Sequence, residues 1–81
     1  MVVSIEFFGR QRVVTKTPSI NMSITHDTRV NDALEYVKSL YPELSLGDGT
    51  TLITVNHEMA SLDRVLMANE IISFLPFIGG G

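Results

Sequence analysis

A single helical pattern, set among strand patterns, limits most strongly what this chain can fold into. Val30, Ala33, Leu34 and Val37 stand at positions i, i+3, i+4 and i+7, which is the apolar stripe of one amphipathic helix. The spacing predicts a helix over about residues 29–40. Thr28 is the predicted N-cap, and Pro42 is predicted to stop the helix. Leu40 or Tyr41 would close its buried face.

Strand patterns lie on both sides of this helix. Apolar and polar residues alternate over residues 2–8 and 20–24, which predicts two strands that form an antiparallel hairpin across the connection 9–18. Shorter patterns predict a strand at 53–55, a tight turn at Asn56-His57, a return strand at 58–61 and a last strand at 71–77. We therefore expect an α+β domain in which one helix packs across one face of a sheet.

The composition indicates a folded domain and narrows its partners. Eighty-one residues form one domain, and 44% hydrophobic with 19% charged residues argue against disorder. A net charge of −3 gives no electrostatic basis for binding nucleic acid or an anionic membrane, and it favours a partner with a basic face. The absence of cysteine and of a signal-peptide pattern at the N-terminus leads us to expect a cytoplasmic protein.

No catalytic or metal-binding constellation is visible in the sequence. His26 and His57 fall in predicted loops, without a neighbour that would complete a ligand set or a catalytic dyad. The Gly-Asp-Gly segment at 47–49 has no following lysine or helix, so it is interpreted as a connection and not as a phosphate loop. We expect a protein that is not an enzyme and that binds no cofactor of its own.

The last strand runs directly into Gly79, Gly80 and Gly81. Glycines have no side chains to pack and lose the most backbone entropy on ordering, so a globular domain at 1–78 is predicted to carry a flexible glycine tail at 79–81. Such a narrow tail can deliver a terminal carboxylate into another protein's active site, and attack at an acyl carbon is least hindered when its own residue and the preceding one are glycines, as at Gly80-Gly81. A disordered terminus or an added tag is the competing explanation.

The order of these elements resembles the ubiquitin-like sulfur carriers, and most of all the small subunit of molybdopterin synthase. Four segments carry the resemblance: 55–58 (Val-Asn-His-Glu), 61–63 (Ser-Leu-Asp), 69–76 (Asn-Glu-Ile-Ile-Ser-Phe-Leu-Pro) and 80–81 (Gly-Gly). The resemblance implies a β-grasp fold, a mixed sheet of four or five strands around one helix, with the first and last strands parallel at its centre.

The resemblance also implies a mechanism and its partners. A ubiquitin-activating-type adenylating enzyme would use ATP to adenylate the carboxylate of Gly81, next to Gly80, and a persulfide sulfur donor would convert it to a thiocarboxylate. The large catalytic subunit of molybdopterin synthase would then use that sulfur to build the molybdenum cofactor. ATP is thus a substrate of the activating enzyme, and the chain itself binds no cofactor.

Three positions depart from the resemblance and leave the pathway open. Gly79 replaces another small residue, Phe77 replaces a frequent second proline, and Asn69 stands where the turn usually has glycine. Carriers for thiamin synthesis or tRNA thiolation, and ubiquitin-like modifiers that join lysines of other proteins, share the fold and the diglycine. A plain β-grasp interaction domain with an unused tail is a further alternative.

A docking patch is predicted where the tail leaves the sheet. By alternation Leu75 and Phe77 point away from the helix, as does Phe8, and a parallel pairing of first and last strands would gather all three at one end of the sheet. An exposed apolar cluster suits a partner interface, although loops could instead fold over it. The predicted partner-binding residues are Phe8, Leu75, Phe77, Ile78 and Gly79.

Overall fold

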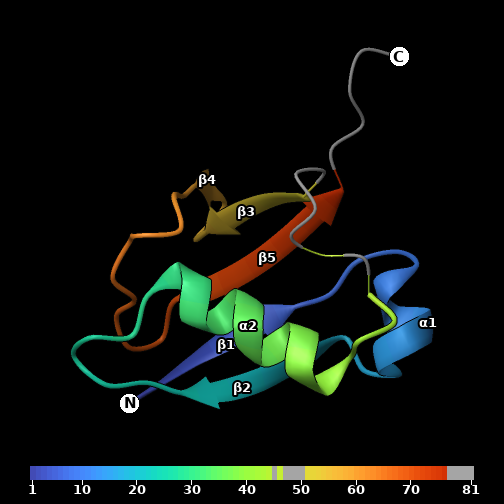
Figure 1. Cartoon of the computed structure of the whole chain (residues 1–81), viewed down its shortest axis with the longest axis horizontal. Coiled ribbons are helices and arrows are strands. Elements are labelled where there is room, and N and C mark those ends of the chain that lie inside the picture. Colours follow the sequence, from blue (N-terminus) through green and yellow to red (C-terminus); the bar gives the residue numbers. More distant parts are fainter. Residues whose placement is uncertain (45, 47–50, 77–81) are drawn as a thin grey trace.

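The computed structural model describes residues 1–44, 46 and 51–76. A five-stranded sheet carries the long helix α2 across one face, and a short helix, α1, lies at the end of the sheet toward which β5 runs (Figure 1). In chain order the elements are β1 (Val2–Glu6), α1 (Gln11–Thr15), β2 (Ser19–Ser23), α2 (Val30–Leu40), β3 (Thr51–Val55), β4 (Glu58–Met59) and β5 (Ile71–Pro76).

The sheet has the strand order β2-β1-β5-β3-β4, with β1 and β5 together in its interior. β1 runs antiparallel to β2 and parallel to β5, where Ser4 pairs with Ile71 and Glu6 with Ser73. β5 in turn runs antiparallel to β3. The predicted α+β architecture is confirmed: this is the β-grasp arrangement of a mixed sheet with its first and last strands parallel at the centre.

The core lies between α2 and the sheet. All four residues of the predicted helical stripe are buried, so the register of the helix was predicted correctly. Across from them, alternate strand residues point inward; burying each of these larger apolar side chains contributes roughly 1.5–3 kcal/mol. The buried strand residues on this face are Val3, Ile5, Met22, Ile53, Val55, Ile72 and Phe74.

The N-terminal end of α2 differs from the prediction, whereas its C-terminal end agrees with it. The N-cap is Arg29 and not Thr28, because the Asp32 carboxylate accepts the Arg29 amide proton (2.8 Å) while the Thr28 hydroxyl accepts that of Thr25 (2.9 Å). At the other end Tyr41 packs edge-on against the ring of Phe7, with centroids 5.7 Å apart. Tyr41, and not the half-exposed Leu40 beside it, therefore closes the buried face.

The connection 9–18 contains an element that the sequence pattern did not predict. β1 ends at Glu6, two residues earlier than expected, and the chain then forms the five-residue helix α1. Lys16 ends this helix with a left-handed backbone (φ 59°), and its amide donates to the carbonyl of Arg12. One turn of helix is too short to show a 3.6-residue period, so periodicity could not reveal it.

The segment 60–70 crosses from β4 to β5 and closes the N-terminal end of α2. The carbonyls of Leu62 and Arg64 accept the free amide protons of Asn31 and Val30 in the first turn of the helix, at 3.0 and 2.9 Å. Leu66 inserts its side chain into the core. These contacts explain how an irregular segment can keep a fixed path over the helix terminus.

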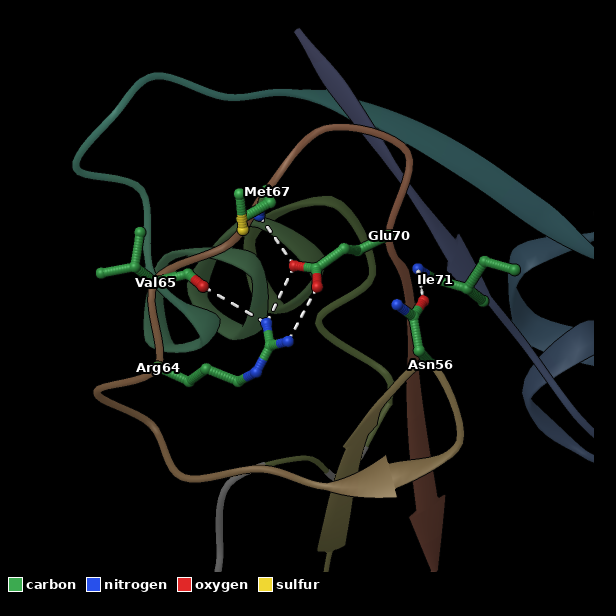
Figure 2. A network of polar contacts seen from close by, with 6 residues as sticks. All are labelled: Asn56, Arg64, Val65, Met67, Glu70 and Ile71. Carbon is green, nitrogen blue, oxygen red and sulfur yellow. Dashed lines mark hydrogen bonds and ion pairs between the residues drawn. The ribbon is translucent and has the colours of Figure 1, made fainter.

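A bidentate ion pair stabilises the same segment (Figure 2). The two terminal nitrogens of Arg64 donate to the two carboxylate oxygens of Glu70 at 2.8 and 2.7 Å, and the Met67 amide donates to Glu70 Oε1 at 2.7 Å. These hydrogen bonds hold the pKa of Glu70 below its usual value and raise that of Arg64. Glu70 is buried, so its charge depends on this pairing.

The predicted turn between β3 and β4 is also present. Asn56 and His57 both have positive φ, 52° and 69°, as a two-residue turn of a hairpin requires. The Asn56 side chain then accepts the amide proton of Ile71 at 2.9 Å, which joins the turn to the start of β5 (Figure 2). The hairpin therefore helps to fix where the last strand begins.

Candidate functional site

The end of β5 is the part of the described chain from which the predicted reactive residues continue. Ile72 and Phe74 point toward α2 and are completely buried, whereas Leu75 is half-buried on the opposite face. There Leu75 pairs with Leu52 of β3, which is also half-buried. The alternation predicted from the sequence therefore holds as far as Leu75.

The pairing of β1 with β5 ends at Ser73, two residues before Leu75. The parallel ladder ends at the pair Glu6–Ser73, after which Phe7 enters the core and Phe8 turns outward, 39% exposed. Beyond Ser73 the β1 side of β5 therefore lacks a neighbouring strand. A backbone carbonyl at such a position needs another hydrogen-bond donor.

The side chain of Gln11 supplies that donor. Its amide nitrogen donates to the carbonyl of Phe74, and its Oε1 accepts the amide proton of Phe8 at 3.0 Å. The carboxamide thus bridges the segment after β1 and the end of β5, where the peptide group of a longer β1 would have paired with β5. Gln11 is the first residue of α1, so this short helix is what positions the bridge.

Sequence reasoning missed Gln11. A single glutamine in a ten-residue connection gives no periodic signal, and its role arises only because β1 departs from the ladder after Glu6. The bridge brings the backbone of Phe8 next to that of Phe74, so two of the predicted partner-binding residues, Phe8 and Leu75, lie at the same end of the sheet.

A cation lies against the exposed phenyl ring at this end. Nε of Arg12 donates to the carbonyl of Phe7 at 2.8 Å, and its guanidinium carbon lies 6.0 Å from the centroid of the Phe8 ring. This is at the outer limit of a cation–π contact, which contributes about 0.5–1 kcal/mol at exposed positions. The hydrogen bond to Phe7 fixes the direction of the Arg12 side chain.

The remaining predicted site residues, Phe77, Ile78, Gly79, Gly80 and Gly81, lie outside the described residues, as does the predicted boundary between a domain at 1–78 and a tail at 79–81. His26 and His57 are exposed in loops, as expected. Within residues 1–44, 46 and 51–76, no group of three or more His, Asp or Glu side chains could hold a metal ion. None of the helices in this part of the chain is long and apolar enough to cross a membrane.

Comparison with known proteins settles which family these features represent. The model of the ThiS family matches residues 5–81, nearly the whole chain. The chain belongs to the ThiS family. This result confirms the resemblance to the ubiquitin-like sulfur carriers, which was drawn from sequence segments alone. Among curated proteins, none matches this ThiS-family chain significantly.

Solved structures confirm the fold. SAMP1 from Haloferax volcanii is 21% identical over the full length of both chains, with a TM-score of 0.83. A putative molybdopterin converting factor subunit 1 from Pyrococcus furiosus is 21% identical over 95% of this chain and 98% of its own, with a TM-score of 0.82. A complex of subunits 1 and 2 of the molybdopterin-converting factor from Helicobacter pylori is 24% identical over the full length of both chains, with a TM-score of 0.58.

Proposed function

We propose that this ThiS-family protein is a sulfur carrier, itself not an enzyme, whose Gly81 carboxylate is adenylated and then converted to a thiocarboxylate. One observation carries the proposal: the strand at the centre of a β-grasp sheet is followed, after Phe77 and Ile78, by Gly79, Gly80 and Gly81. Five residues follow the last described residue of β5, and a fully extended chain of that length spans at most about 18 Å. The proposal takes Gly81 as the C-terminus of the mature protein.

The chemistry needs no catalytic group from the carrier. The Gly81 carboxylate attacks the α-phosphorus of ATP on an adenylating enzyme of the ubiquitin-activating type, which forms an acyl adenylate and releases pyrophosphate. The terminal sulfur of a persulfide donor then displaces AMP from the acyl carbon, and a thiol cleaves the sulfur–sulfur bond to leave the thiocarboxylate. The acyl carbon belongs to Gly81 and follows Gly80, so no side chain nearby hinders either attack.

The acceptor that we propose is a precursor of the molybdenum cofactor, on the large catalytic subunit of molybdopterin synthase. The similarity to a putative molybdopterin converting factor subunit 1, and to a complex of subunits 1 and 2 of such a factor, supports this choice. Phe8 and Leu75 at the end of the sheet would contact the partner, together with Phe77, Ile78 and Gly79. A chain without cysteine has no need of an oxidising compartment, so the proposed location is the cytoplasm.

A second candidate function is that of a ubiquitin-like protein modifier. The structure of the small archaeal modifier protein 1 of Haloferax volcanii superposes on the whole chain, and a modifier would begin with the same acyl adenylate. The two functions differ only in the nucleophile that takes the acyl group, a sulfur donor or a lysine. Carriers for thiamin synthesis or tRNA thiolation differ only in the final acceptor.

Intact mass spectrometry of the protein from its native cell tests the proposal. An exchange of oxygen for sulfur at Gly81 supports the carrier, whereas isopeptide adducts on lysines of other proteins support the modifier. Detection of neither form, in cells grown with active molybdenum-cofactor synthesis, would contradict both. The same spectrum establishes whether Gly81 is the last residue of the mature chain.

A deletion variant tests the role of Gly81 in isolation. Removal of Gly81 shortens the reach by one residue and should abolish adenylation by the cognate activating enzyme, while the melting temperature stays unchanged because a glycine contributes no side-chain packing. The variant Lys38→Ala, on the exposed side of α2 and outside the proposed partner contacts, is the control and should retain adenylation. Normal adenylation of the deleted chain would refute the mechanism.

A further inference from the structure

The charged residues of the chain are unevenly distributed. Residues 7–26 include Arg10, Arg12 and Lys16 and no acidic residue, so this segment carries a charge of +3. The other residues include all nine acidic and only three basic ones, which gives them a net charge of −6. A protein that is acidic on average therefore has one basic segment.

The fold places this basic segment on and beside α1. Arg10, Arg12 and Lys16 are all exposed, and among the described residues no carboxylate comes within 4 Å of them. Two exposed apolar side chains accompany these charges: Val13, which lies between Arg12 and Lys16 and is 73% exposed, and Phe8, which precedes Arg10 and lies next to the guanidinium of Arg12. We call these five residues, Phe8, Arg10, Arg12, Val13 and Lys16, the α1 face.

The α1 face is joined to the strand that leads to the reactive end. Gln11, within the same helix, donates to the carbonyl of Phe74, two residues before the end of β5. α1 also forms one wall of a groove of about 570 Å³, whose lining includes Arg10, Val13 and, from the segment after α2, Glu43. Glu43 is the acidic residue in the lining of this groove.

We propose that the α1 face is a docking surface for an acidic surface of the adenylating enzyme that receives Gly81. The inference rests on the proposed function and adds the chemistry of the partner. Net charge alone favours a partner with a basic rim, but the segment 7–26, which Gln11 joins to β5, carries a charge of +3. Exposed apolar side chains surrounded by cations are the pattern of an interface whose apolar contacts bind and whose rim charges steer association.

A charge-reversal pair tests this inference. Arg10→Glu and the control Arg29→Glu change the net charge equally, and Arg29 lies at the start of α2, outside the α1 face. With the full-length protein, ATP and the cognate adenylating enzyme, kcat and KM for pyrophosphate release are measured at low and at high salt. Urea unfolding of both variants shows whether each remains folded.

We expect Arg10→Glu to raise KM about tenfold at low salt and to leave kcat within about twofold, because a rim charge acts on association. The effect should shrink at about 0.5 M salt, where screening is strong, and Arg29→Glu should behave as the wild type. An equal effect of the two reversals would overturn the inference, as it would show a response to net charge only. An improved KM for Arg10→Glu would also overturn it, because it would show a basic partner surface.

The outcome also separates this inference from the proposed function. If the wild type is adenylated and Arg10→Glu has an unchanged KM, only the proposed docking surface is refuted. If no adenylating enzyme of its cell activates the wild type, the proposed function is refuted, and the docking surface with it.

Discussion

Removing Arg64 from its ion pair with Glu70 should destabilise the fold more than removing the charge of Glu70. Glu70 is 8% exposed, while the side chain of Arg64 is 38% exposed. Arg64→Ala leaves the carboxylate buried with the Met67 amide as its one remaining donor among residues 1–44, 46 and 51–76. Breaking a buried ion pair from one side costs roughly 3–5 kcal/mol; because water reaches the Arg64 side, we expect about 2–4 kcal/mol here.

The opposite change should cost less. In Glu70→Gln the side-chain carbonyl can still accept the Met67 amide proton, and the guanidinium of Arg64 can turn toward water, so we expect a loss of about 1–2 kcal/mol. As a control, Lys38→Ala removes the exposed pair with Glu35 (3.5 Å) and should change stability by less than about 0.5 kcal/mol. Urea unfolding measures all three variants. Equal or greater destabilisation by Glu70→Gln would refute the reasoning.

The same pair predicts a pH dependence. Hydrogen bonds from Arg64 lower the pKa of Glu70 in the folded state, so the folded protein holds this proton less tightly than the unfolded chain does. The stabilisation is therefore present in full above the unfolded-state pKa of about 4.3, and it is lost as the pH falls through that value toward the folded-state pKa. The stability difference between the wild type and Glu70→Gln should accordingly shrink as the pH falls below about 4. A stability difference between these two proteins that stays constant from pH 7 to 3 would contradict this prediction.

Two further predictions concern the core and the end of β5. Leu34→Ala should leave a cavity beneath α2 and cost about 2–5 kcal/mol by urea unfolding, whereas Leu40→Ala, at a half-exposed position, should cost less than half as much; equal losses would show that the helix register is wrong. Gln11→Ala should speed hydrogen exchange of the Phe8 amide at least tenfold, and Gln11→Glu, which keeps an acceptor for that amide, should not; unchanged exchange in Gln11→Ala would mean that the bridge does not form in solution.

The elements with a clear period were predictable from the sequence. α2 has an apolar stripe of two full turns, and the alternating residues of β1 and β2 mark which side chains face it. Burial of Phe74 and partial exposure of Leu75 followed from the same rule. Local periodicity reports which face of an element is buried, and this information was enough to place one helix on one sheet.

The pairing of β1 with β5 could not be predicted in this way. These strands are separated by most of the chain, and a parallel register between distant segments leaves no mark on either of them. The prediction came from the resemblance to a known family. The N-cap of α2 was missed for a different reason. Thr28 is a favourable N-cap residue, but its hydroxyl accepts the amide proton of Thr25, and the helix begins instead at Arg29, whose amide donates to Asp32.

The position of the basic residues shows most clearly what the fold adds to the sequence. Net charge averages over all faces of a molecule, but a partner contacts one face. At physiological salt, screening weakens electrostatic interactions beyond about 8 Å. Arg10 and Lys16 are close in sequence to the first strand, yet they matter because β1 lies beside β5 and because Gln11 joins α1 to Phe74. Through that parallel pair, a basic segment near the start of the chain comes to lie beside the strand that leads to its last residues. The local charge there, and not the average of −3, is what an approaching enzyme would meet.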